Sequence, residues 1–170
     1  MPREHMAAKK AAPEAPGAMA SAPLSEGNDK KTIDTRFGTI EFDLDQALNF
    51  PKAIPGFTGY HTFGLAMVPS ETQSSFMLLQ ALEPTDLSFI VLPYDPGAAL
   101  IEPKDIETAQ QHLGIGAGDC AIMLIATFRR IGDSFETSVN MRAPIFIDTA
   151  NRLAWQHILP NDRYDVRHTL

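Results

Sequence analysis

Short runs of alternating apolar and polar residues, separated by turn-forming residues, begin near Ile33 and continue through the rest of the chain. Alternation with a period of two is typical of β-strands that bury one face. Residues 37–44 place three apolar side chains on one side and two acidic ones on the other: Ile40, Phe42 and Leu44 against Glu41 and Asp43. Further runs predict strands over residues 61–67, 75–82, 87–92, 120–130, 134–141, 143–147 and 152–159. The pattern predicts a mainly β domain, either a small antiparallel β-barrel or a sandwich.

The clearest hairpin joins residues 120–130 to residues 134–141 through the turn Ile131-Gly132-Asp133. Its second arm alternates strictly, with one side formed by Phe135, Thr137, Val139 and Met141 and the other by Glu136, Ser138, Asn140 and Arg142. The first arm is apolar at every position from 121 to 126, which predicts a central strand covered on both faces. Cys120 opens that arm, so we expect a small buried hydrophobe rather than a reactive thiol.

One short amphipathic helix is predicted between Pro103 and Gly114. Proline is favoured at the first helical position, acidic side chains suit the first turn, and glycine supplies a left-handed stop. Ile106, Ala109 and Leu113, with Gln110, share one face at helical spacing. The glycines at 114–118 lack the lysine and hydroxyl residue of a phosphate-binding loop, so this stretch is interpreted as a connector.

Residues 1–30 have a different composition, rich in alanine and proline, with Leu24 as the one large aliphatic side chain other than methionine. Such a segment buries too little apolar surface to offset the entropy of ordering, which predicts a disordered arm. It also lacks the continuous apolar stretch of a secretory signal. The expected organisation is therefore an arm over residues 1–30 and one domain over residues 31–170.

Charge and cysteine content narrow the functional classes. The 170 residues carry a formal net charge of −7, which argues against direct binding to nucleic acid. One cysteine cannot form an internal disulfide, and no stretch is long and apolar enough to span a membrane, so a cytoplasmic protein is expected. Residues 53–103 contain no lysine or arginine. This acidic span is either an ordinary solvated surface or a face for a basic partner.

Catalytic signatures are missing from the sequence. The histidines are too scattered to suggest a metal site, and no nucleophile-elbow motif is present. Paired carboxylates are common in any acidic chain, so without their geometry they do not indicate acid–base catalysis. We therefore expect no enzyme activity, no cofactor, no metal and no small-molecule substrate.

Residues 50–57 combine two prolines and a glycine with three large apolar side chains, Phe50, Ile54 and Phe57. Proline fixes its own φ and biases the preceding residue toward extended structure, so this loop is stiff. Two interpretations remain open and are compatible with each other. The loop closes the end of the barrel, or it presents an ordered apolar ridge to a protein partner.

Three segments together resemble the bacterial flagellar assembly factor FliW family: residues 50–57 (FPKAIPGF), 79–89 (LQALEPTDLSF) and 139–148 (VNMRAPIFID). The C-terminal run around Tyr164 is also similar to the end of that family. The resemblance extends over residues 33–170. Two departures are visible: alanine stands at position 53 where the family commonly has glycine, and the N-terminal arm is not part of the common pattern.

The resemblance implies a small antiparallel β-barrel-like domain that is not an enzyme. Proteins of the family bind the translational repressor CsrA and also flagellin, and FliW released by flagellin export relieves repression of flagellin messenger RNA. The action on CsrA lies away from its RNA-binding surface, so the coupling is allosteric and reciprocal. An acidic span would complement a basic CsrA dimer.

Partner-contacting residues follow from these observations as a hypothesis. The apolar candidates are Ile54, Phe57 and Tyr60, the acidic candidates are Glu83 and Asp86, and the hairpin contributes Asn140 and Arg142, whose alternative role is the solvent face of an edge strand. Two other functions stay open. One is a small β-barrel enzyme or carrier that binds flavin, with its phosphate held by Arg129 and Arg130; the other is an export chaperone that binds flagellin alone.

Overall fold

The structure is a computed structural model that describes residues 29–69, 74–160 and 162–170. Most of the predicted arm therefore lies outside the described residues, and Lys30 already belongs to the first strand. The elements in chain order are β1 (Lys30–Thr35), β2 (Gly38–Asp43), η3 (Leu44–Gln46), β3 (Leu48–Asn49), β4 (Thr62–Met67), β5 (Met77–Ala81), β6 (Ser88–Pro93), η4 (Pro96–Ala98), α2 (Pro103–Leu113), η5 (Ala117–Asp119), β7 (Cys120–Ile131), β8 (Ser134–Val139), β9 (Ile145–Asp148), β10 (Leu153–Gln156) and β11 (His168–Thr169).

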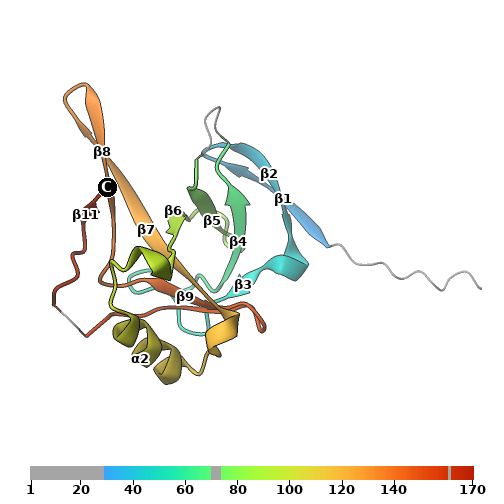
Figure 1. Ribbon diagram of the computed structural model, residues 1–170. Coiled ribbons are helices and arrows are strands. Elements are labelled where there is room, and N and C mark those ends of the chain that lie inside the picture. The colour runs from blue at the N-terminus through green and yellow to red at the C-terminus, as the bar shows by residue number, and fades with distance from the viewer. Residues whose placement is uncertain (1–28, 70–73, 161) are drawn as a thin grey trace, which may run out of the picture.

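The described strands form a main sheet that closes on itself, as the mainly β, barrel-like prediction requires. Its order is β11-β8-β7-β6-β5-β4-β3-β10-β9, and β9 pairs back onto β7 to complete a ring. The pairs are antiparallel except for β10 and β3, which run parallel. The strands β8 and β11 extend the sheet beyond the ring, so that the β7–β8 hairpin projects from the body (Figure 1).

A separate two-stranded sheet, β1 with β2, packs against the ring at β4 and β5. Phe42 of β2 is 2 % exposed and lies over Gly64, where an added Cβ would approach its ring to 2.5 Å. Glycine at this position therefore permits the close approach of the two sheets. One expectation is wrong here: Leu44 does not continue the apolar side of β2, because η3 begins at this residue and leaves it 38 % exposed.

Two main apolar clusters fill the interior. One lies inside the ring, around Phe50, Phe63 and Ile145, and the other lies between the ring and α2, around Ile122 and Phe146. The strand β7 serves both clusters, which explains why its first half is apolar at every position. From Phe128 to Ile131 the same strand is exposed, because it has left the body of the barrel.

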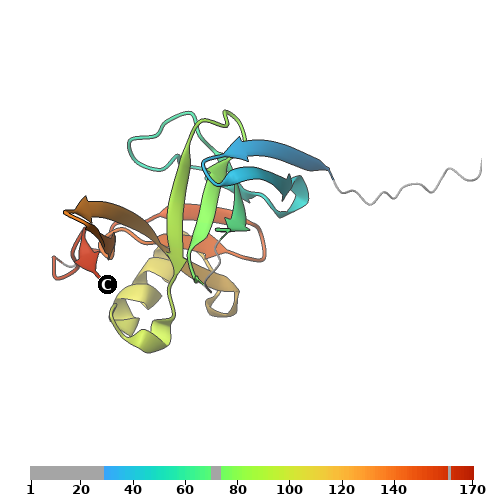
Figure 2. The ribbon, with the colours of Figure 1, turned by 90° about the horizontal axis from the view of Figure 1, so that it is seen from above.

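The helix α2 begins and ends where the sequence predicts. Pro103 occupies the first turn and Gly114 ends the helix with φ +73°. Ile106 and Ala109 are buried against the second cluster, so α2 covers one side of the barrel (Figure 2). Cys120 is half-buried, and burial raises the pKa of its thiol.

Candidate functional site

The loop between β3 and β4 is anchored to the core inside the ring by its apolar residues. Phe50 and Ile54 are 0 % and 2 % exposed and belong to the cluster inside the ring, so Ile54 faces the core rather than the surface. The amide of Phe50 donates to the carbonyl oxygen of His61 at 2.7 Å, and Nδ1 of His61 lies 2.7 Å from the carbonyl oxygen of Phe50. These contacts make the loop a closure of the barrel end.

The outer part of the same loop carries Phe57, the third of its large apolar side chains. Phe57 is 36 % exposed and packs edge-on against Phe89 of β6, with ring centroids 5.1 Å apart. Gly56, with φ +90°, makes the turn before it, and Phe57 N donates to the carbonyl oxygen of Ile54. Ala53 is not among the described residues with positive φ, so alanine there causes no backbone strain.

A hydrogen bond joins this loop to the turn between β5 and β6. The hydroxyl of Tyr60 donates to Oδ1 of Asp86 at 2.8 Å, and this bond to the carboxylate raises the pKa of Tyr60. Glu83 is exposed in the same turn. The fold therefore brings together four of the predicted residues, which we name the loop–turn surface: Phe57, Tyr60, Glu83 and Asp86.

Two residues that sequence reasoning missed hold this surface in place. Gln80 is 2 % exposed, and its Nε2 donates to the carbonyl oxygens of Ala81, Thr85 and Leu87 at 2.9, 2.8 and 3.2 Å. Arg36 reaches across from the β1–β2 turn, and its Nη2 donates to the carbonyl oxygen of Ser88 at 3.0 Å. The sequence does offer a signal for Gln80, because it is a single polar residue inside the apolar run of β5.

The acidic span of residues 53–103 does not form one continuous face. Glu83 and Asp86 lie before β6, whereas Asp95 and Glu102 lie after it, toward α2. Oδ1 of Asp95 accepts a hydrogen bond from the Gly97 amide, and Glu102 pairs with Arg163 at 2.8 Å. Only the first pair of carboxylates belongs to the loop–turn surface.

Asn140 and Arg142 lie elsewhere, just beyond the end of β8. Oδ1 of Asn140 accepts hydrogen bonds from the amides of Arg142 and Ala143, both at 3.0 Å, and the guanidinium of Arg142 pairs with Asp162. The structure thus gives both side chains a local role in the turn toward β9. This turn follows β8, whereas the loop–turn surface is formed before β4 and between β5 and β6. A contact of Asn140 and Arg142 with a partner stays a prediction.

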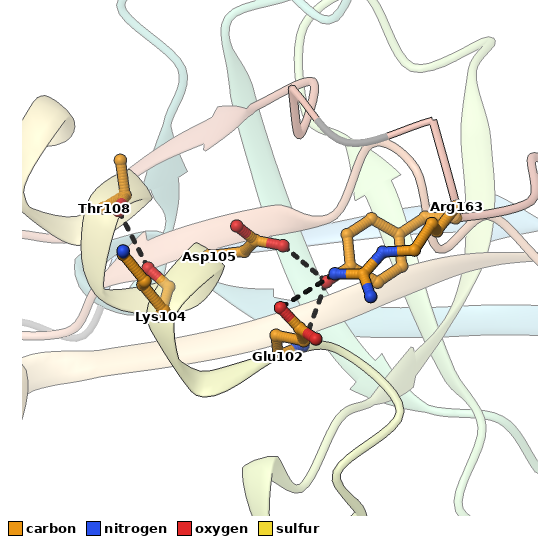
Figure 3. A network of polar contacts seen from close by, with 6 residues as sticks. Glu102, Lys104, Asp105, Thr108 and Arg163 are labelled. Carbon is orange, nitrogen blue, oxygen red and sulfur yellow. Dashed lines mark hydrogen bonds and ion pairs between the residues drawn. The ribbon is translucent and has the colours of Figure 1, made fainter.

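Figure 3 shows the network that ties the C-terminal segment to the start of α2. The hydroxyl of Tyr164 donates to Oδ2 of Asp105 at 2.6 Å and accepts a hydrogen bond from the amide of Glu102 at 3.0 Å. Burial, together with the bond to Asp105, raises the pKa of Tyr164. Arg163 and Tyr164 thus contact Glu102 and Asp105, and these contacts hold the C-terminal segment against the start of α2.

The features considered for cofactor or metal chemistry are also engaged locally. Arg129 pairs with Glu136 at 2.8 Å, and Nε of Arg130 donates to the carbonyl oxygen of Gly132. The rings of His112 and His157 lie in a tilted contact, with their centroids 5.4 Å apart. Across residues 29–69, 74–160 and 162–170, no three histidine, cysteine or acidic side chains converge as a metal site. None of the helices in the described part of the chain is long and apolar enough to cross a membrane.

The closed ring, the helix that covers it and the loop–turn surface at one end define a small β-barrel protein. The FliW protein family profile matches residues 31–170, and the chain belongs to this family. The flagellar assembly factor FliW of Desulfitobacterium hafniense strain Y51 is 33 % identical over 144 residues, which are 82 % of this chain and 90 % of that protein.

Two further comparisons agree with this assignment. The flagellar assembly factor FliW of Thermoanaerobacter pseudethanolicus is 32 % identical over 142 residues, covering 81 % of this chain and 91 % of that protein. A crystal structure of the flagellar assembly factor FliW matches with a TM-score of 0.63 and 29 % identity, and covers 82 % of this chain and 96 % of that chain.

Proposed function

We propose that this protein is a non-enzymatic, cytoplasmic regulator of flagellum assembly that binds both CsrA and flagellin. Membership of the FliW family and the names of its relatives as flagellar assembly factors support the role in assembly. The resemblance of residues 50–57, 79–89 and 139–148 supports the two partners. In this proposal flagellin and CsrA compete, so that export of flagellin frees the protein to antagonise CsrA.

The loop–turn surface is the single observation that carries the proposal. It combines an ordered aromatic group, Phe57, with two exposed carboxylates, and its backbone is fixed by the core residues beneath it and by Gln80. A surface ordered before binding loses little conformational entropy on association. Carboxylates beside an aromatic anchor suit a basic partner with an apolar contact, which is the chemistry expected of a CsrA dimer.

Phe57→Ala tests the aromatic part of this surface. Because Phe57 is already one-third exposed, its truncation costs less than the roughly 3 to 5 kcal/mol of a fully buried phenylalanine. We expect CsrA to bind at least tenfold more weakly to the variant by titration calorimetry, with the melting temperature little changed. Ile158→Ala, at an exposed apolar residue elsewhere, is the matched control and should bind normally. Equal affinity for Phe57→Ala and the parent chain would place the contact elsewhere.

Charge reversal tests the acidic part. In Glu83→Lys/Asp86→Lys, long-range attraction to a basic partner is lost, so association should slow and lose much of its dependence on salt. Stopped-flow mixing with CsrA between about 50 and 300 mM salt measures the association rate and its dependence on salt. A parent association rate that is the same at all salt concentrations would refute electrostatic steering at this surface.

A flavin-binding barrel is not favoured by any observation, since both arginines offered for its phosphate are engaged within the hairpin. The remaining alternative, a chaperone for flagellin alone, predicts binding to flagellin and none to CsrA. Separate titrations of the full chain with each protein distinguish the two. Absence of binding to both would contradict the proposal.

A further inference from the structure

A small pocket lies where the last turn of α2 meets the end of β10 and the β3–β4 loop. Its volume is about 190 Å³. The polar side chains that line it come from three separate segments: Lys52 from the loop, His112 from α2, and Trp155, Gln156 and His157 from β10 and the residue that follows it. No residue of the loop–turn surface lines this pocket.

The main chain around the pocket is fixed by the body of the barrel. Lys52 stands in the β3–β4 loop between Phe50 and Ile54, which are 0 % and 2 % exposed inside the ring. The amide of His157 donates to the carbonyl oxygen of Pro144 at 3.0 Å, which holds the chain in place after β10. The side chains of the pocket are therefore brought together by anchored segments and lose little freedom on binding a ligand.

The pocket offers hydrogen-bond donors and no acidic side chain. An ammonium group, an indole N–H and two imidazole rings line it, from Lys52, Trp155, His112 and His157. Across the described ranges, these four side chains make no hydrogen bond or ion pair with the rest of the chain. None of the described residues that line the pocket is aspartate or glutamate, although the 170 residues carry a net charge of −7. Unpaired donors without neighbouring carboxylates suit a negatively charged ligand.

The two imidazole rings lie close enough for their charges to interact. Their centroids are 5.4 Å apart, and burial together with the neighbouring His112 lowers the pKa of His157. Phe146 of β9 packs edge-on against His157, with centroids 6.0 Å apart, and brings no charge. An anion held by Lys52 and the two rings would offset the repulsion between the imidazoles and favour the protonated form of His157.

We propose that this pocket binds a phosphate group, an oxyanion that carries close to two negative charges at neutral pH. Lys52 and the two imidazole rings donate to its oxygens, and the indole N–H of Trp155 donates a further hydrogen bond. Hydrogen bonds from charged donors to such oxygens are roughly twice as strong as neutral ones. A divalent cation does not suit the pocket, because Lys52 brings positive charge and the described lining has no carboxylate.

Sulfate is the first probe, because it has the shape of phosphate and keeps both charges between about pH 5.5 and 8, where histidine titrates. The full chain is titrated with sodium sulfate at constant ionic strength, maintained with chloride, and the ring signals of His112 and His157 are followed by NMR. We expect shifts that saturate, tighter binding at about pH 5.5 than at about pH 8, and a higher pKa of His157 in the saturated protein. Shifts that do not saturate, or equal affinity at both pH values, would overturn the proposal.

Acetate, inorganic phosphate and phenyl phosphate then define the ligand at about pH 7.5. We expect acetate to bind more weakly than inorganic phosphate, because it carries a single charge. Acetate that binds as tightly as phosphate would overturn the assignment to a phosphate group. Tighter binding of phenyl phosphate than of inorganic phosphate would support the proposal with a phosphate ester as the ligand, and equal binding would support it with free phosphate.

Variants of the protein locate the site. Lys52→Gln and His112→Gln each remove one ionisable donor from an exposed side chain, so we expect roughly tenfold weaker sulfate binding and little change in melting temperature. Lys104→Gln is the matched control, since it removes the same charge from an exposed residue of α2 that does not line the pocket, and it should bind sulfate as the parent chain does. Unchanged binding to Lys52→Gln and His112→Gln, or an equal loss in Lys104→Gln, would overturn the proposal.

Discussion

A methyl group at Gly64 would lie 2.5 Å from Cδ1 of Phe42 and 3.2 Å from Cδ2 of Leu82. Both neighbours are buried, so neither can move without disturbing the contact between the β1–β2 hairpin and the ring. We expect Gly64→Ala to lower the free energy of unfolding by about 1 to 3 kcal/mol. Denaturant unfolding measures this, and Gly118→Ala, where an added Cβ has open space, should be nearly neutral. Equal stabilities would show that the two sheets can separate at no cost.

His157 gives the fold a dependence on pH. Burial and the neighbouring His112 lower its pKa below the ordinary value near 6.5, so the unfolded chain binds a proton more readily. The contribution of His157 to the free energy of unfolding is therefore greatest above about pH 6.5, and it decreases as the pH falls toward the folded-state pKa. Urea midpoints measured from about pH 7.5 to 5.5 should fall less in His157→Gln than in the parent chain. Parallel profiles would rule out this contribution.

At the scale of elements, one hydroxyl group, that of Tyr164, makes two of the polar contacts that attach the C-terminal segment to the start of α2. Tyr164→Phe removes the bond to Asp105 and leaves the amide of Glu102 without its acceptor. We expect a loss of about 1 to 2 kcal/mol in the free energy of unfolding, measured by urea denaturation. Tyr60→Phe removes an exposed hydroxyl that also bonds a carboxylate, and should change stability by no more than about 0.5 kcal/mol. A Tyr164→Phe effect as small as that of Tyr60→Phe would contradict the structural role of the network.

Elements with strong local signals were predictable from the sequence. In α2, the residues at both ends and the spacing of the apolar residues indicate the same helix. In the first half of β7, the apolar run agrees with burial on both faces of the strand. The strand β1 was missed because only Ile33 of its six residues is buried. Strand β10 ends at Gln156, earlier than predicted, since the chain then turns toward Leu159, which is buried in the second cluster.

The candidate surface was predictable only in part, for a physical reason. Sequence alone identifies a stiff apolar loop but not which of its side chains the barrel takes inward, so Ile54 and Phe57 looked equivalent. Which of the two side chains is buried depends on packing between strands that are distant in the sequence. The same holds for the acidic span, whose carboxylates are divided by β6, and for Asn140, whose side chain bonds the turn that follows it.

At the scale of the whole molecule, the chain presents the loop–turn surface at one end of a closed sheet. The loop–turn surface lies where the β3–β4 loop meets the β5–β6 turn. Rigid sheets that carry exposed loops suit recognition, because binding then orders little additional chain. A net charge of −7 adds a general attraction for basic partners.

Competition between the two proposed partners tests the central claim most directly. The full chain is titrated into the CsrA of its own organism, and the titration is repeated with the chain saturated by that organism's flagellin. The account predicts binding to CsrA in the first titration and its loss in the second, because flagellin and CsrA compete for binding to this protein. Binding to flagellin with no binding to CsrA in either titration would contradict it and identify a chaperone instead.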